Sequence, residues 1–185
     1  MKTIYIERSS GHGRDGGWVE ELDLAGVERI VVGTGPGSFA GIRSAIAFAQ
    51  GFALGCRCEV LGLPSPCAIA AQVFSSAKLE STRLAVVGDA RCGKLWVALF
   101  NGYELSREVF QTDRNECAGA FSDDFLVVTP DDERIGELLK ATFADRYIGG
   151  MLPTDEGLRL FAEANPAMMR PQPLPIYLNP AVRKT

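Results

Sequence analysis

The chain has 185 residues, of which 46% are hydrophobic, and its formal net charge is −4. This length and composition exclude a disordered tail protein and suit one medium domain or two small lobes. Proteins that grip a nucleic acid backbone alone usually carry a basic excess, so the acidic balance argues against direct nucleic acid binding.

The N-terminus and the cysteines indicate a compartment. Residues 1–8 lack the apolar run of a signal peptide, and no other segment reaches the unbroken apolar length of a membrane-spanning helix. An odd cysteine count argues against a closed disulfide framework and for a reducing environment. The five are Cys56, Cys58, Cys67, Cys92 and Cys117. We expect a cytoplasmic protein with no membrane contact.

The first elements are short. Residues 4–6 predict a strand, and the glycine-rich stretch 9–17 predicts turns. A brief helix over 18–24 would end at Gly26, and residues 30–32 predict a buried strand because they are β-branched and bounded by glycine.

A longer helix follows a second glycine-rich turn, Gly33–Gly37. Ser38 is a natural N-cap for a helix that runs to about Leu54, with Gly55 as its left-handed terminator. Residues 58–63 predict another strand, and Ser65-Pro66 begins another helix.

The second half predicts an antiparallel meander followed by α/β structure. Its strands are residues 84–88, 95–100 and 104–111, with a type I′ hairpin at Asn101-Gly102. Residues 125–128 predict a strand, and helices are predicted over 131–143 and from Thr154 to Ala164. The five prolines of residues 166–180 predict an extended tail on the surface.

The turn at Gly33–Gly41 does not match a known phosphate loop. A Walker loop needs Gly-Lys-Ser/Thr, and the nearest dinucleotide frame has Ser38 where the third glycine belongs. Generic nucleotide binding at this turn is therefore not expected.

The helix after the turn is apolar on most sides. Ile42, Ala45, Ile46, Ala49 and Ala53 form one stripe, and Phe48 and Phe52 form a second on another face. One stripe can face a sheet, while the other needs either the neighbouring helix at 66–78 or a second protein. The residue pattern leaves both alternatives open.

Four sequence blocks carry a resemblance. Residues 35–43 read Gly-Pro-Gly-Ser-Phe-Ala-Gly-Ile-Arg, which resembles the Gly-Pro-Gly-Ser-Phe-Thr-Gly-Leu/Ile-Arg signature of the TsaB (YeaZ) family. Residues 49–65 continue it, with Ala-Gln-Gly-Phe-Ala-Leu and Leu-Gly-Leu-Pro-Ser resembling Ala-Lys-Gly-Leu-Ala-Leu and Val-Gly-Val-Ser-Ser. Residues 89–100 are similar to the family's Asp-Ala-Arg-Arg-Gly-Glu-Val-Tyr block, and residues 175–179 to Pro-Leu-Tyr-Leu-Arg.

The resemblance implies an actin-like (ASKHA) α/β fold of two lobes, here residues 1–80, shortened, and residues 81–185. It implies a non-catalytic subunit that activates a TsaD-type catalytic subunit in tRNA threonylcarbamoyladenosine modification. A TsaE-type ATPase and a second copy of the chain are further partners to expect. The implied partner interface is Gly35, Pro36, Gly37, Ser38, Phe39, Gly41, Arg43, Phe48 and Phe52.

Nucleotide binding is expected only at an interface that this chain forms with a partner. Family members open with a strand that ends in Asp-Thr-Ser, which Glu7-Arg8-Ser9 alters, and residues 10–27 are too few for the elements that usually follow. We therefore expect no intrinsic cofactor, and ATP or ADP only where a partner completes the site. The resemblance would place Asp89, Arg91 and Gly93 at the second phosphate-loop position of such folds, but a solvated β-turn is the favoured explanation of these residues.

Few residues of the sequence support an enzymatic function. A TsaD-type metal site needs a His-x-x-x-His pair, and His12 is the single histidine. Cys56 and Cys58 would point to opposite faces of a strand, which favours core residues over a zinc site. A diverged ASKHA-type ATPase or peptidase, or a paralogue that only self-associates, remain the alternatives to an accessory subunit.

Overall fold

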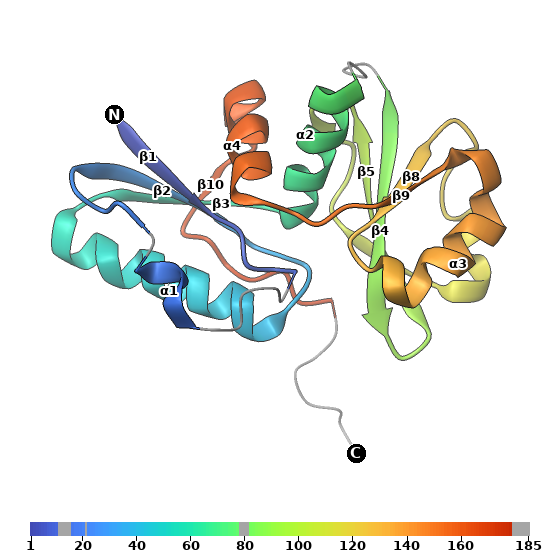
Figure 1. Cartoon of the computed structure of the whole chain (residues 1–185), viewed down its shortest axis with the longest axis horizontal. Coiled ribbons are helices and arrows are strands. Elements are labelled where there is room, and N and C mark those ends of the chain that lie inside the picture. Colours follow the sequence, from blue (N-terminus) through green and yellow to red (C-terminus); the bar gives the residue numbers. More distant parts are fainter. Residues whose placement is uncertain (11–15, 21, 78–81, 179–185) are drawn as a thin grey trace. The chain divides into compact units, whose positions relative to one another are not determined.

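The computed structural model describes residues 1–10, 16–20, 22–77 and 82–178, and Figure 1 shows their path. The chain divides into two compact units. The first combines Met1–Ala68 with Pro153–Ile176, and the second is built on Ile69–Leu152. His12, which the enzymatic alternatives required, lies outside the described residues.

This division differs from the expected lobes, 1–80 and 81–185. Helix α4, Asp155–Ala164, packs against strands β1 and β2, and strand β10, Arg170–Pro171, pairs with β3. The segment 153–176 therefore returns to the first unit, because its partners lie there.

The first unit contains a four-stranded sheet in the order β1-β2-β3-β10. Strands β1 (Lys2–Ile6), β2 (Val27–Gly33) and β3 (Glu59–Leu63) are parallel, and β10 is antiparallel to β3. The predicted buried run at 30–32 forms the centre of β2 and is fully buried. A strand buried on both faces is typical of a parallel sheet covered on both sides.

Helices cover both faces of this sheet. Helix α1 (Phe39–Cys56) packs against β2 and β3, and Figure 1 shows α4 on the opposite face. Ser38 and Thr154 are N-caps as predicted, since their hydroxyls accept hydrogen bonds from Gly41 N and Gly157 N. Helix α2 (Ser65–Ala77) begins in this unit and continues into the second from Ile69. Two short 3-10 helices, η1 (Gly16–Val19) and η4 (Pro166–Met168), also belong to the first unit.

The second unit contains a sheet in the order β6-β5-β4-β8-β9, with β7 also pairing with β5. Its strands are β4 (Arg83–Arg91), β5 (Lys94–Asn101), β6 (Glu104–Leu105), β7 (Phe110–Asp113), β8 (Leu126–Thr129) and β9 (Tyr147–Gly150). Strands β4 to β7 form the predicted antiparallel meander, with its last strand in two pieces.

Helix α3 (Asp132–Phe143) covers this sheet, with the 3-10 helices η2 (Arg114–Gly119) and η3 (Ala144–Arg146) beside it. The predicted apolar face of α3 is confirmed, because Ile135, Leu139 and Phe143 are buried and Leu138 packs against them.

Some local predictions are wrong. Helix α1 continues past Gly55 to Cys56, and Arg57 takes the left-handed position instead. The hairpin after β5 turns at Gly102-Tyr103, one residue later than predicted, because Asn101 pairs with Glu104. The helix predicted over 18–24 is reduced to η1.

The proline-rich segment is not a simple surface tail. Arg170–Pro171 forms β10 at the edge of the first sheet, and Pro173 is buried against Gly62. An edge strand can accommodate proline because it needs fewer backbone donors. Residues 179 and 180 lie outside the described residues.

Candidate functional site

The glycine-rich turn between β2 and α1 is fixed by the segment that begins α2. Gly35 N donates to Ser65 Oγ and Ser65 N donates to Gly35 O, both at 2.9 Å. Gly35 has φ +90°, which favours glycine, and the Gly35–Pro36 peptide is cis. Gly35 and Pro36 are buried, so two residues of the expected interface are internal to this chain.

The chain just after β1 crosses the start of α1 at very short range. A Cβ atom at Gly37 would lie 2.3 Å from Ser9 O, and one at Gly41 would collide with Arg8 O. Ser38 N also donates to Ser9 O at 2.6 Å. Close backbone packing therefore explains the glycines of the Gly-Pro-Gly-Ser-Phe-x-Gly pattern.

Glu7 is a buried carboxylate at the end of β1, the position altered from the family's aspartate. Its Oε1 accepts from Ser9 N at 2.6 Å, while Oε2 has no hydrogen-bond partner among the described residues. Burial is the main cause that raises the pKa of Glu7, and the serines Ser9 and Ser65 partly counteract it. The sequence could not reveal this, because a glutamate after a short strand is ordinarily exposed.

The inner side of α1 explains both predicted stripes. Ile42, Ala45, Ile46 and Ala49 are buried in the core of the first unit. Phe48 and Phe52 are half-buried beside that core, and Phe48 meets Trp18 edge-on with ring centroids 5.3 Å apart. Residues of this chain therefore cover much of the two phenylalanines that were expected to need a partner.

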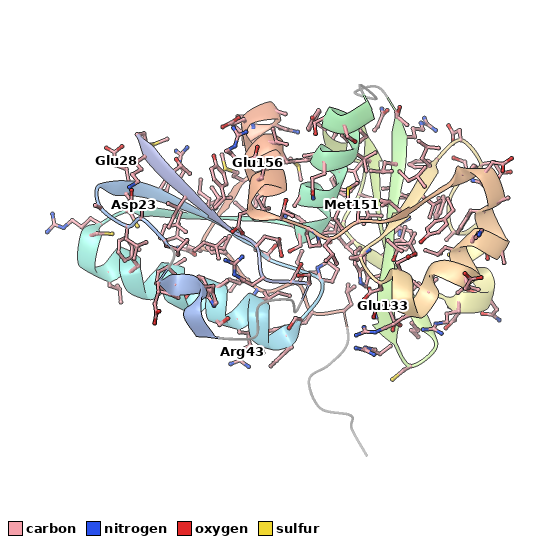
Figure 2. All side chains as sticks on the ribbon, in the orientation of Figure 1. Asp23, Glu28, Arg43, Glu133, Met151 and Glu156 are labelled. Atoms are coloured by element: carbon pink, nitrogen blue, oxygen red, sulfur yellow. The ribbon has the colours of Figure 1, made fainter. Side chains whose placement is uncertain are left out.

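The outer side of α1 carries a different set of residues. Its exposed positions include Phe39, Ala40, Arg43, Ser44, Ala47, Gln50, Gly51 and Leu54. Phe39 is 47% exposed and Leu54 is 89% exposed. Figure 2 shows Arg43 on the side of α1 turned away from the sheet, where its guanidinium lies 4.9 Å from the Phe39 ring centroid. We call these eight residues the outer face of α1.

The outer face is apolar and open. Arg43 is its one charged residue, and a Cβ atom added at Gly51 would meet nothing within 4 Å. Ala40, Ala47, Gly51 and Leu54 recur at helical spacing, which makes a continuous stripe of mostly small side chains. Sequence periodicity does not reveal this stripe, because alanine and glycine are weak periodicity signals.

Helix α1 is also long and apolar enough to cross a membrane by length and composition alone. This differs from the expectation that no segment reaches that length. However, 22% of the helix is buried inside the protein, and that part lies on β2 and β3. A core helix of a soluble protein can pass the same test, so the result is weak support for a membrane span.

The second candidate position is an ion-pair cluster in the second unit. The Asp89 side chain is only 4% exposed, and its carboxylate lies 3.0 Å from Arg114, 3.8 Å from Arg91 and 4.0 Å from Arg134. Asp89 N donates to Asp131, whose own pKa is raised mainly by burial. The interpretation of Asp89 as part of a solvated turn is therefore wrong.

The hairpin beyond Asp89 is built on three consecutive positive φ angles. Arg91, Cys92 and Gly93 have φ values of 67°, 51° and 78°, and Arg114 N donates to Gly93 O. The three arginines are 41% to 63% exposed, so their guanidinium groups can reach an anion while Asp89 orients them. Across the described residues, no group of three or more His, Cys, Asp or Glu side chains is placed to hold a metal ion.

Comparisons with known proteins agree with this architecture. Residues 20–141 match the family model described as TsaD, tRNA N6-adenosine threonylcarbamoyltransferase. Over 75 residues the chain is 35% identical to the tRNA threonylcarbamoyladenosine biosynthesis protein TsaB of Escherichia coli K12. That match covers 40% of this chain and 32% of the Escherichia coli protein, so it spans about a third of the relative.

Two solved structures from Pseudomonas aeruginosa share the fold at 23% identity. One, an uncharacterized protein with similarity to peptidase YeaZ, has a TM-score of 0.68 over 90% of this chain and 80% of its own. The other, YeaZ, has a TM-score of 0.65 over 82% of this chain and 74% of its own. The chain therefore belongs to the TsaD-type family, and within it to the TsaB (YeaZ) group with the actin-like ASKHA α/β fold.

Proposed function

We propose that this chain is a non-catalytic partner subunit that binds and activates a TsaD-type transferase in tRNA threonylcarbamoyladenosine modification. Its membership of the TsaB group supports the pathway, since the Escherichia coli relative is described as a biosynthesis protein of that modification. The acidic net charge of −4 fits a protein that reaches RNA through a partner.

The observation that carries the proposal is the outer face of α1. An apolar helix on a soluble protein is normally covered on its apolar sides, yet this face exposes Leu54 and Phe39. The small residues Ala40, Ala47 and Gly51 let another helix approach closely. The proposed association surface therefore consists of Phe39, Arg43, Leu54 and the small residues between them. It no longer includes Phe48 and Phe52.

Residue chemistry favours a partner over an enzyme. His12 is the single histidine of the chain, so a His-x-x-x-His metal pair cannot form within it. Asp89 is engaged by three arginines, and Glu7 is a buried carboxylate held by Ser9. The Asp89 carboxylate and Oε1 of Glu7 are thus held by contacts within the chain.

Co-elution tests the proposal directly. The chain is mixed with the TsaD-type subunit of the same organism, with and without a TsaE-type ATPase, and passed over a sizing column. Leu54→Asp and Ala47→Asp should each weaken association by at least about tenfold, because a charge would be buried in the contact. Ile148→Asp, at an exposed apolar position on β9, is the matched control and should leave association unchanged.

Four further readouts separate the alternatives. Transferase activity of the TsaD-type subunit should rise with the wild-type chain and not with Leu54→Asp. Hydrolysis of ATP or of a peptide by the pure chain would support the diverged enzyme instead. Sedimentation of the chain alone reports self-association, and nucleotide titrated into the chain and into the complex shows whether ATP or ADP needs the joint interface.

A further inference from the structure

Two cysteines lie on either side of Arg57, the C-cap residue of α1. Cys56 is the last residue of the helix, Arg57 is its C-cap with φ 56° and ψ 30°, and Cys58 immediately precedes β3. The expectation that the two thiols point to opposite faces of a strand is wrong, because residues two apart in a strand share a face and neither cysteine lies within a strand. The left-handed cap removes that regular geometry.

The cap brings the two side chains together. Two extended peptide units span roughly 7 Å between Cα atoms, and a left-handed residue between them shortens this distance. Disulfides need a Cα separation of about 4.4 to 6.8 Å. The Cys56 thiol is also among the causes that raise the pKa of Cys58, as expected for two side chains at short range.

The two thiols differ in their surroundings. Cys56 is exposed, and its Sγ donates to the carbonyl oxygen of Phe52 at 3.3 Å. Cys58 is 9% exposed and packs into the core of the first unit. Burial, and then the hydrogen bond with Cys56, raise the pKa of the Cys58 thiol to about 11. Cys56 is accordingly the thiol that a soluble oxidant meets first, with Cys58 behind it.

We propose that Cys56 and Cys58 form a modification site at which a hydroperoxide converts the two thiols into an intramolecular disulfide. The Cys56 thiolate attacks one peroxide oxygen, the O–O bond breaks, and hydroxide leaves as Cys56 becomes a sulfenic acid. The Cys58 sulfur then attacks the Cys56 sulfur, and the Cys58 proton leaves with the departing hydroxyl as water. In sum, two thiols and one hydrogen peroxide give one disulfide and two waters.

The short chain separation across the left-handed Arg57 makes the second step intramolecular. A sulfenic acid beside a resolving thiol is captured before further oxidant or another protein can react with it. Cys92, an exposed cysteine in the β4–β5 hairpin, provides an internal comparison within the same chain.

Peptide mapping of the full-length chain tests the site. Reduced protein is treated with hydrogen peroxide, alkylated under denaturing conditions, digested and analysed by mass spectrometry. Trypsin cuts after Arg57, so a disulfide should join two tryptic peptides that dithiothreitol then separates. In Cys58→Ser, trapping of a Cys56 sulfenic acid with dimedone should rise by at least about tenfold over wild type.

Variants at position 57 test the geometry independently of the sulfurs. Arg57→Gly keeps the left-handed cap accessible and should preserve disulfide formation. Arg57→Val disfavours that conformation and should lower the disulfide yield several-fold. The proposal is overturned if Cys56 of the wild type is oxidised while Cys58 stays reduced and is therefore alkylated. It is also overturned if Cys56 forms a disulfide with Cys92, or if Arg57→Val forms the Cys56–Cys58 disulfide as readily as wild type.

Discussion

The carbonyl oxygen of Arg8 lies 2.0 Å from the position that a Cβ atom at Gly41 would occupy. Arg8 follows the first strand, and Gly41 is in the first turn of α1, so two segments distant in sequence meet backbone to backbone. The obstacle is main chain rather than a flexible side chain. Only a shift of the helix or of the crossing segment could relieve it.

Gly41→Ala should therefore destabilise the protein, by about 1–3 kcal/mol, although alanine is the better helix former. Gly51→Ala in the same helix meets open space and should stabilise it by up to about 1 kcal/mol. Urea unfolding followed by circular dichroism measures both. Equal effects of the two substitutions would contradict the close approach.

Glu7 should make the protein less stable as pH rises. Its pKa is raised in the folded state, so between the ordinary value of 4.5 and the raised value the folded chain holds a proton that the unfolded chain has released. The free energy of unfolding then falls by up to about 1.4 kcal/mol for each pH unit in that interval.

Glu7→Gln isolates this contribution from other groups, including Asp131, whose pKa is also raised. The variant keeps an oxygen acceptor for Ser9 N and removes the titration. Its stability relative to wild type should increase from pH 4.5 toward neutral pH. A difference that stays constant across this range would show that Glu7 does not titrate differently in the folded state.

The two sides of α1 should respond oppositely to charge. Ala45 is fully buried, so Ala45→Asp places a carboxylate in the core and should cost several kcal/mol or prevent folding. Ala47, two residues later, is exposed, and Ala47→Asp should change the unfolding free energy by no more than about 0.5 kcal/mol. Thermal unfolding of the two variants also establishes that loss of association by Ala47→Asp is not loss of fold.

Asp89 should be a stabilising residue of the second unit. Asp89→Asn leaves three arginines without their shared carboxylate and should cost about 1–3 kcal/mol. Asp113→Asn, at an exposed carboxylate on β7 that makes no cap hydrogen bond, should stay within about 0.5 kcal/mol of wild type. Urea unfolding at low and high salt compares them, and similar losses in both variants would contradict the organising role of Asp89.

Local signals in the sequence were sufficient for much of the fold. Ser38 and Thr154 begin their helices as predicted, because a capping hydroxyl acts within three residues. The buried strand around Val31 was equally local. Strands β9 and β10 were missed, since their pairing with β8 and β3 depends on distant segments and their own runs are short.

The candidate site depended more on tertiary contacts. Periodicity shows that α1 is apolar on several sides, but Trp18 decides which of those sides this chain covers. The short separation of Cys56 and Cys58 depends on a left-handed arginine at a cap position that glycine usually occupies. The burial of Asp89 depended on Arg114 and Arg134, which come from other elements.

The return of residues 153–176 to the first unit has a consequence for biosynthesis. Most of the second unit, Ile69–Leu152, precedes α4 and β10 in the sequence, so this part can fold on the ribosome while they are still untranslated. The first sheet, in contrast, is incomplete until β10 is translated, and until then the outer edge of β3 is unpaired. That edge is open to pairing with other nascent chains until β10 is translated, so this interval carries a raised risk of aggregation.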